Sequence, residues 1–234
     1  MAVEDLRASS TPFSLSFSGS GFLALYQVGV VQSLLELAPE LLKSACKVYG
    51  SSAGSLIAAA VDTAPNPSVC PHNPMRPNGN LCPCKALVLS QACGLVLVQG
   101  HTLGTRTTLR SFGRMLPEDS YLLASGRLHI SLTRVVDGQN VMASEFSSKE
   151  ELIQRYVDGG FTGLQPVSSL EEPVITVSPF TGELDICPRD CPAIFFCFQI
   201  FNGSIQISIE NLCRISYALF PPSTMVRPPG FLPA

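Results

Sequence analysis

The chain has 234 residues and a formal net charge of −3, a length that suits one domain with a sizeable core. Because the chain has no excess of positive charge, we expect no nucleic-acid partner. Charged residues make up only 14% of the chain, against about 25% in typical soluble domains. This indicates a sheet that is buried on both faces, with a lipid-facing surface as a further source of apolar residues.

The first predicted elements are a strand, a glycine-rich loop and a helix. Phe13, Leu15 and Phe17 alternate with serines, which is the period of a strand. Residues 18–21 read Ser-Gly-Ser-Gly, and apolar residues at helical spacing then continue until Pro39. A loop of this kind between a strand and a helix presents backbone N–H groups to an anion.

A dinucleotide site is the alternative for this loop. The G-x-G-x-x-G pattern that begins at Gly19 fails at its sixth position, where Ala24 stands. No acidic residue follows about 20 residues later at a strand end, where Lys43 and Lys47 are found instead. The loop therefore fits an oxyanion better than a pyrophosphate.

Residues 46–60 read CKVYGSSAGSLIAAA and contain the clearest catalytic pattern of the chain. A short β-branched and aromatic run ends at Gly50, and a helix rich in alanine begins after Gly54. This is the strand, turn and helix context of a G-x-S-x-G nucleophile elbow. Ser52 is therefore the predicted nucleophile, and a plain Gly/Ser turn is the alternative.

The next stretch is loop-like, because residues 63–84 contain six prolines. Four of the nine cysteines lie in or near it, close to His72, which raises the possibility of a zinc site: Cys70, Cys82, Cys84 and Cys93. Their spacing lacks the C-x2-C pairs of structural zinc sites. We expect reduced thiols, and neither a metal nor another cofactor.

Four further elements are predicted in the second half of the chain. Residues 128–134 and 140–144 read as strands joined by the Asp-Gly turn at 137–138. Ser147 and Glu150 form a capping box for a short helix, and residues 174–178 read as a buried strand.

The last predicted element is a helix over residues 207–220. Leu212, Ile215 and Leu219 lie on one face of it. Packing of this face in the core is the prediction, and lipid contact is the alternative.

Asp158 follows an apolar pair and precedes Gly159 and Gly160. The sequence predicts a carboxylate at the end of an extended segment, with an ordinary turn as the alternative. Beside a serine hydroxyl, such a carboxylate could accept the proton without a histidine.

Together these segments resemble the patatin-like phospholipase family, whose enzymes use a Ser–Asp dyad. The blocks that are similar to its vertebrate branch with adipose triglyceride lipase and adiponutrin include SFSGSGFLALYQVGVVQSLLELAPELL, YGSSAG, GRLHISLTRVVDGQNV, YVDGG and ITVSPFTGELDICP. DICPRDCPAIF and SIENLCRISYALFPP look most like the member of that branch that makes ω-O-acylceramides. The resemblance implies Ser52 as nucleophile and Asp158 as base. It also implies an oxyanion hole from the backbone of Gly19, Ser20 and Gly21.

The chain departs from the family in three places. Gln154 runs directly into Arg155, where relatives carry a further apolar segment, and residues 62–112 do not look like the helices of the family. Relatives continue into another helix where residues 223–234 stand. We therefore expect a tail at 1–12, a patatin-like domain at 13–222 with an altered segment at 62–112, and a tail at 223–234.

The expected fold is α/β, with three layers: a mainly parallel central sheet and helices on both faces. The expected activity is that of a carboxylic ester hydrolase or acyltransferase acting on triacylglycerol or related lipid esters. No secretory signal or membrane span is predicted, since the longest apolar run, residues 86–98, is too short for a bilayer. We expect a cytoplasmic protein that lies peripherally on lipid droplets or intracellular membranes.

Two other functions remain as alternatives. The chain order Ser52, Asp119, His129 allows a Ser–His–Asp hydrolase, although His129 lies inside a predicted strand, where a packed core histidine is the usual case. The second alternative is a catalytically impaired scaffold that coats lipid surfaces or binds a lipase.

Overall fold

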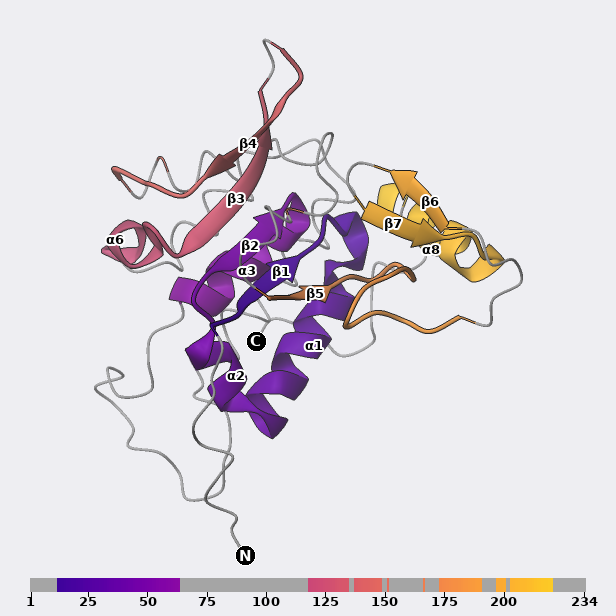
Figure 1. Cartoon of the computed structure of the whole chain (residues 1–234), viewed down its shortest axis with the longest axis horizontal. Coiled ribbons are helices and arrows are strands. Elements are labelled where there is room, and N and C mark those ends of the chain that lie inside the picture. Colours follow the sequence, from indigo (N-terminus) through magenta and orange to yellow (C-terminus); the bar gives the residue numbers. More distant parts are fainter. Residues whose placement is uncertain are drawn as a thin grey trace, which may run out of the picture.

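A computed structural model of the chain describes residues 12–63, 118–134, 137–148, 151, 166, 173–190, 197–200 and 203–220. Its centre is a five-stranded sheet in the order β4-β3-β2-β1-β5 (Figure 1). The strands are β1 (Ser14–Phe17), β2 (Val48–Ser51), β3 (Leu128–Thr133), β4 (Asn140–Ala143) and β5 (Val174–Val177). Strands β1, β2, β3 and β5 are parallel, and β4 pairs antiparallel with β3 at one edge. The predicted α/β fold with a mainly parallel sheet is confirmed.

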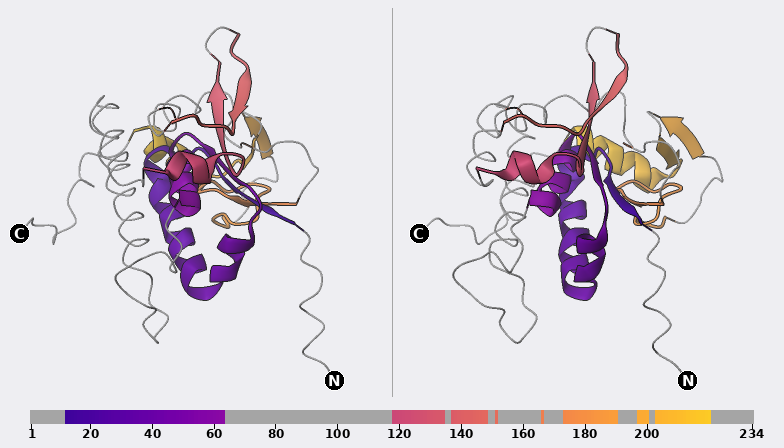
Figure 2. Two further views of the ribbon diagram at one scale, coloured as in Figure 1. Left: turned by 90° about the vertical axis from the view of Figure 1, so that its left-hand side faces the viewer. Right: turned by 60° about the vertical axis from the view of Figure 1, so that its left-hand side comes forward.

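The described helices lie around this sheet. They are the 3₁₀ helix η2 (Gly21–Leu23), α1 (Ala24–Leu37), α2 (Pro39–Ser44), α3 (Ala53–Thr63), α6 (Ser120–Ala124) and α8 (Ile209–Leu219). A separate antiparallel hairpin, β6 (Cys197–Ile200) and β7 (Gly203–Gln206), leads into α8. Figure 2 shows that the β3–β4 hairpin projects beyond the rest of the sheet.

Local sequence signals explain several element ends. Pro39 follows the last turn of α1 and is the first residue of α2, where its missing N–H costs nothing. The β3–β4 turn uses Gly138 at φ +68°, and Arg134 contacts the carboxylate of Asp137 at 3.2 Å. The predicted strands of this hairpin and the predicted strand at 174–178 are therefore confirmed within one or two residues.

The core forms on one face of the sheet because apolar residues alternate along the strands. Leu15, Val48 and Leu128 are fully buried in one cluster with the small residues of α3. Ser14 and Ser51 point to the opposite face and are also fully buried. The sheet is therefore covered on both faces. Its apolar face packs against α1 and α3, and its serine-rich face is also buried.

Part of the predicted capping box lies in the described chain. The Ser148 hydroxyl accepts the N–H of Glu151 at 3.1 Å, and the Glu151 carboxylate accepts the N–H of Ser147. Glu150 lies outside the described residues, so its pairing with Ser147 stays a prediction.

One local prediction, that for α8, is corrected. Leu212 and Leu219 are 57% and 67% exposed and Ile215 is only partly buried, so the prediction that this face packs in the core is wrong. Periodicity identified the residues that share a face but not the direction of that face. The predicted tails at 1–12 and 223–234 and nearly all of segment 62–112 lie outside the described residues.

Candidate active site

Ser52 lies in the tight turn between β2 and α3. Its φ is +50°, and it is the only non-glycine residue in the described part of the chain with a positive φ. Such a conformation is costly for a residue with a Cβ and is concentrated at functional sites. Ser52 is only partly buried, while Ser51 and Ala53 on either side are buried. The turn therefore presents the Ser52 side chain at the carboxyl end of a parallel strand, where α/β folds place their active sites.

The two glycines of the motif are required by close backbone contacts. A Cβ on Gly50 would lie 2.5 Å from Cα of Ser55, and a Cβ on Gly54 would lie 2.5 Å from the carbonyl oxygen of Phe17. It would also collide with the carbonyl oxygen of Ser18. The first turn of α3 therefore packs directly on the end of β1, which brings the serine turn beside the glycine-rich loop.

The glycine-rich loop is held by a buried glutamine. Gln27 of α1 is fully buried, and its Nε2 donates to the carbonyl oxygens of Ser18 at 2.9 Å and of Val177 at 3.3 Å. Its Oε1 accepts the Ser20 hydroxyl at 3.1 Å. One side chain thus ties the loop to α1 and to the end of β5.

The predicted oxyanion residues keep their backbone donors free of this network. Within the described chain, the hydrogen bonds of the loop use the N–H groups of Ser18 and Leu23, and none uses those of Gly19, Ser20 or Gly21. Gly21 has φ +50° and lies against α8, because a Cβ there would be 2.5 Å from the carbonyl oxygen of Ala218. Helix α8 therefore forms the outer support of the loop.

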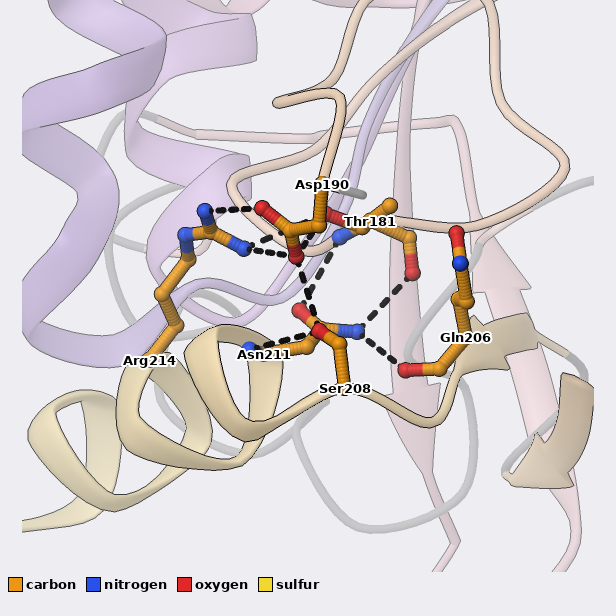
Figure 3. A network of polar contacts seen from close by, with 6 residues as sticks. All are labelled: Thr181, Asp190, Gln206, Ser208, Asn211 and Arg214. Atoms are coloured by element: carbon orange, nitrogen blue, oxygen red, sulfur yellow. Dashed lines mark hydrogen bonds and ion pairs between the residues drawn. The ribbon is translucent and has the colours of Figure 1, made fainter. Parts of the chain in front are cut away.

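Helix α8 is itself anchored by a polar network around Asp190 (Figure 3). Arg214 donates to both carboxylate oxygens of Asp190, at 2.7 Å and 2.6 Å, and the same carboxylate accepts the hydroxyls of Thr181 and Ser208. The hydrogen bonds from Arg214 hold the pKa of Asp190 well below its usual range. Asn211, which is fully buried, adds hydrogen bonds to the backbone of Thr181 and Gln206.

Sequence reasoning missed both Gln27 and this network. The signal for Gln27 was present, because it lies on the same stripe of α1 as buried Ala24, Val28 and Val31. A polar residue in a buried stripe requires a partner. The partners of Arg214 and Asn211 lie 24 and 30 residues away along the chain, so spacing alone could not identify them.

Several other predicted site residues fall outside the part of the chain that the structure describes. Asp158, Gly159 and Gly160 lie outside the described residues. The same holds for the residues of the zinc site that the spacing disfavours: Cys70, His72, Cys82, Cys84 and Cys93. Among the described residues, no group of three or more potential ligands could hold a metal ion.

His129, the histidine of the alternative triad, lies inside the sheet. It pairs with Tyr49 in register, and the two rings stack at a tilt with centroids 4.8 Å apart. Its Nδ1 lies 3.0 Å from the carbonyl oxygen of Arg127. Ser52 follows Tyr49 by three residues, which is about 10 Å along a strand. Asp119, the acid of that triad, is exposed just before α6.

A buried carboxylate lies near the other end of α3. The Asp62 side chain is 1% exposed, and one of its oxygens lies 3.1 Å from Nε of Arg127 without the alignment of a hydrogen bond. Burial raises the pKa of Asp62 to about 6, against the opposing charge of Arg127. Asp62 is ten residues beyond Ser52, near the far end of α3, so it acts on stability rather than in the site.

Comparison with known proteins agrees with this geometry. The profile of the family "Patatin-like phospholipase" matches residues 15–73, which include the loop and the serine turn. The chain is 42% identical over 245 residues to omega-hydroxyceramide transacylase of Homo sapiens, covering 92% of this chain and 43% of that protein. It is 41% identical over 252 residues to patatin-like phospholipase domain-containing protein 2 of Rattus norvegicus, covering 92% and 48%.

A third relative carries a different activity in its name. The chain is 34% identical over 244 residues to 1-acylglycerol-3-phosphate O-acyltransferase Pnpla3 of Mus musculus, covering 92% of this chain and 55% of that protein. The chain thus spans about half the length of the curated relatives it matches. No helix in the described ranges is long and apolar enough to cross a membrane. By its sequence identities and its α/β architecture, the chain belongs to the patatin-like phospholipase family.

Proposed function

We propose that the chain transfers acyl groups from lipid esters, with Ser52 as nucleophile and Asp158 as general base. The observation that carries the proposal is the positive φ of Ser52 at the carboxyl end of a parallel strand. That conformation presents the Ser52 hydroxyl at the turn, next to the glycine-rich loop. The N–H groups of residues 19–21 in this loop take no part in the internal hydrogen bonds of the described chain.

The proposed reaction has two steps, acylation of Ser52 and transfer of the acyl group to an acceptor. Oγ of Ser52 bonds to the ester carbonyl carbon while its proton passes to Asp158, and the N–H groups of residues 19–21 stabilise the oxyanion. The ester C–O bond then breaks, the alcohol leaves with the proton from Asp158, and Ser52 remains acylated. In the second step, water or a lipid hydroxyl gives its proton to Asp158 and takes the acyl group, which restores the Ser52 hydroxyl.

The acyl acceptor decides between hydrolase and transacylase. Water gives a lipase, and a lipid hydroxyl gives a transacylase. The names of the relatives include a transacylase and an acyltransferase, so both acceptors are part of the proposal. Triacylglycerol or a related neutral ester is the proposed acyl donor, reached at the surface of lipid droplets or intracellular membranes by a peripheral protein.

A Ser–Asp dyad is favoured over a triad by the place of His129. That ring packs on Tyr49 inside the sheet, about 10 Å along the strands from the turn of Ser52. A general base must come within roughly 3 Å of the proton that it removes, so His129 is in the wrong part of the sheet.

The test is acyl release from a triacylglycerol emulsion, with and without an added lipid alcohol as acceptor. Ser52→Ala and Asp158→Asn should each abolish release, whereas His129→Gln should retain most of it. Ser55→Ala is the matched control, because its buried hydroxyl has no hydrogen-bond partner among the described residues and should be dispensable. Loss of activity in a folded His129→Gln protein would favour the triad. Full activity in Ser52→Ala would refute the proposed nucleophile.

A further inference from the structure

Helix α8 is amphipathic in the reverse sense of an ordinary surface helix. Its polar residues Asn211 and Arg214 face the domain, where Asn211 is fully buried and Arg214 pairs with Asp190 (Figure 3). Ile215 and Ala218 are partly buried on the same side, whereas Ile209, Leu212 and Leu219 are exposed. Hydrogen bonds and an ion pair therefore fix the helix to the domain, and the apolar side chains on its other side remain exposed.

We define the outer face of α8 by four apolar side chains with exposed fractions of 57% to 75%. Three lie on the helix and the fourth follows its last residue: Ile209, Leu212, Leu219 and Phe220. Leucines 212 and 219 are seven residues apart and so lie on one side of the helix. Burying one such side chain contributes roughly 1.5–3 kcal/mol. A group of exposed apolar side chains on one side of a helix indicates a place of contact with a partner or a lipid phase.

The position of α8 links this face to the site. The carbonyl of Ala218 packs against Gly21 of the proposed oxyanion loop. Ala218 and Leu219 are neighbours in sequence but project about 100° apart around the helix. The same helix turn thus supports the loop on one side and exposes apolar residues on another.

The charges of α8 indicate the kind of surface that it fits. Arg214 is the only cation of the helix, and it is held by Asp190, while Glu210 is exposed. Helices that bind anionic membranes are rich in free lysine and arginine. The outer face of α8 has no such charge to offer, so an uncharged lipid surface is the matching partner.

We propose that the outer face of α8 docks this protein on an uncharged lipid surface, beside the loop that would receive the ester. The inference rests on the proposed function, because only a lipid-borne substrate explains why a docking face should adjoin that loop. Docking itself requires no chemistry and can be measured separately.

The test is flotation of the full chain with triolein droplets coated with phosphatidylcholine. The wild-type protein should float, and the double variant Leu212→Gln/Leu219→Gln should partition at least about tenfold less onto the droplets. The matched control is Leu37→Gln/Leu122→Gln, which changes two leucines on α1 and α6 (Figure 1) that are 84% and 63% exposed. This control should float like the wild type, and circular dichroism should show that all three proteins are folded.

Three results would overturn the docking proposal. The first is equal flotation of the α8 variant and the wild type. The second is stronger binding to vesicles containing phosphatidylserine than to the uncharged droplets. The third is a wild-type dimer in sedimentation that the α8 variant converts to a monomer, since a second copy would then cover the face.

Hydrolysis of a dispersed short-chain ester separates this inference from the proposed function. The α8 variant should hydrolyse that ester at the wild-type rate, and Ser52→Ala should float normally without hydrolysing it. If no protein hydrolyses the ester but flotation depends on α8, the proposed function fails and the docking face stands.

Discussion

The side-chain amide of Gln27 donates a hydrogen bond to the carbonyl oxygen of Ser18 at 2.9 Å. This contact fixes the glycine-rich loop to α1. The same amide reaches the carbonyl oxygen of Val177 at the end of β5. Three parts of the chain therefore meet at one buried side chain. We therefore expect the shape of the proposed oxyanion loop to depend on this contact as well as on the glycines.

Gln27→Leu should reduce ester turnover by roughly 10- to 100-fold, because a shift of even 1 Å in a catalytic group has an effect of that order. It also leaves the Ser18 carbonyl and the Ser20 hydroxyl without their buried partner, at a cost of about 1–3 kcal/mol. Steady-state kinetics on a dispersed ester, corrected for the folded fraction, measure the effect. Gln32→Leu is the control, since that residue is exposed on α1. Equal rates in the two variants would refute the positioning role of Gln27.

Gly54 and Gly29 offer a matched pair of glycine-to-alanine changes. A Cβ on Gly54 meets the carbonyl oxygen of Phe17 at 2.5 Å, whereas a Cβ on Gly29 in α1 meets nothing within 4 Å. Gly54→Ala should therefore destabilise the fold and abolish turnover, since backbone must move. Gly29→Ala should stabilise it by about 0.5–1 kcal/mol, as for glycine in any helix interior. Chemical denaturation measures the free energy of unfolding of both variants. An unchanged free energy of unfolding in Gly54→Ala would show that α3 does not pack closely on β1.

The sequence predicted individual strands, the serine turn and the glycine-rich loop because these depend on local patterns. It could not predict that Gln27 faces Val177, 150 residues away, or that Arg214 reaches Asp190. The error at α8 has the same origin. Leu212 and Leu219 share a face in any helix, but only the long-range contacts of Asn211 and Arg214 turn that face outward.

The partly buried ion pair of Arg214 and Asp190 should matter more than an exposed one. Arg214→Met leaves the carboxylate of Asp190 with only the hydroxyls of Thr181 and Ser208, and should lower the free energy of unfolding by about 2 kcal/mol. Adding Asp190→Asn should recover part of that loss. Arg134→Met breaks the exposed pair with Asp137 and should change stability by less than about 1 kcal/mol. Equal losses for the two arginine variants, by urea denaturation, would contradict this account of α8.

Asp62 should make stability depend on pH. Its folded-state pKa of about 6 lies above the ordinary value near 4, so the folded protein prefers the protonated carboxyl. This contribution is fully present below pH 4 and is lost as the pH rises through 6. Asp62→Asn should therefore gain about 2 kcal/mol over the wild type between pH 4.5 and pH 7.5. Urea denaturation at both pH values measures the gain, and a difference that does not change with pH would show that Asp62 is not buried as described.

Covalent labelling by a fluorophosphonate tests the role of Ser52 most directly, because the reagent reacts with an activated serine and needs no lipid surface. Intact mass and peptide sequencing should find one adduct, on Ser52, in the wild type and in Ser55→Ala, and no adduct in Ser52→Ala. An adduct on another residue, undiminished labelling of Ser52→Ala, or no labelling of the folded wild-type protein would each contradict Ser52 as the nucleophile.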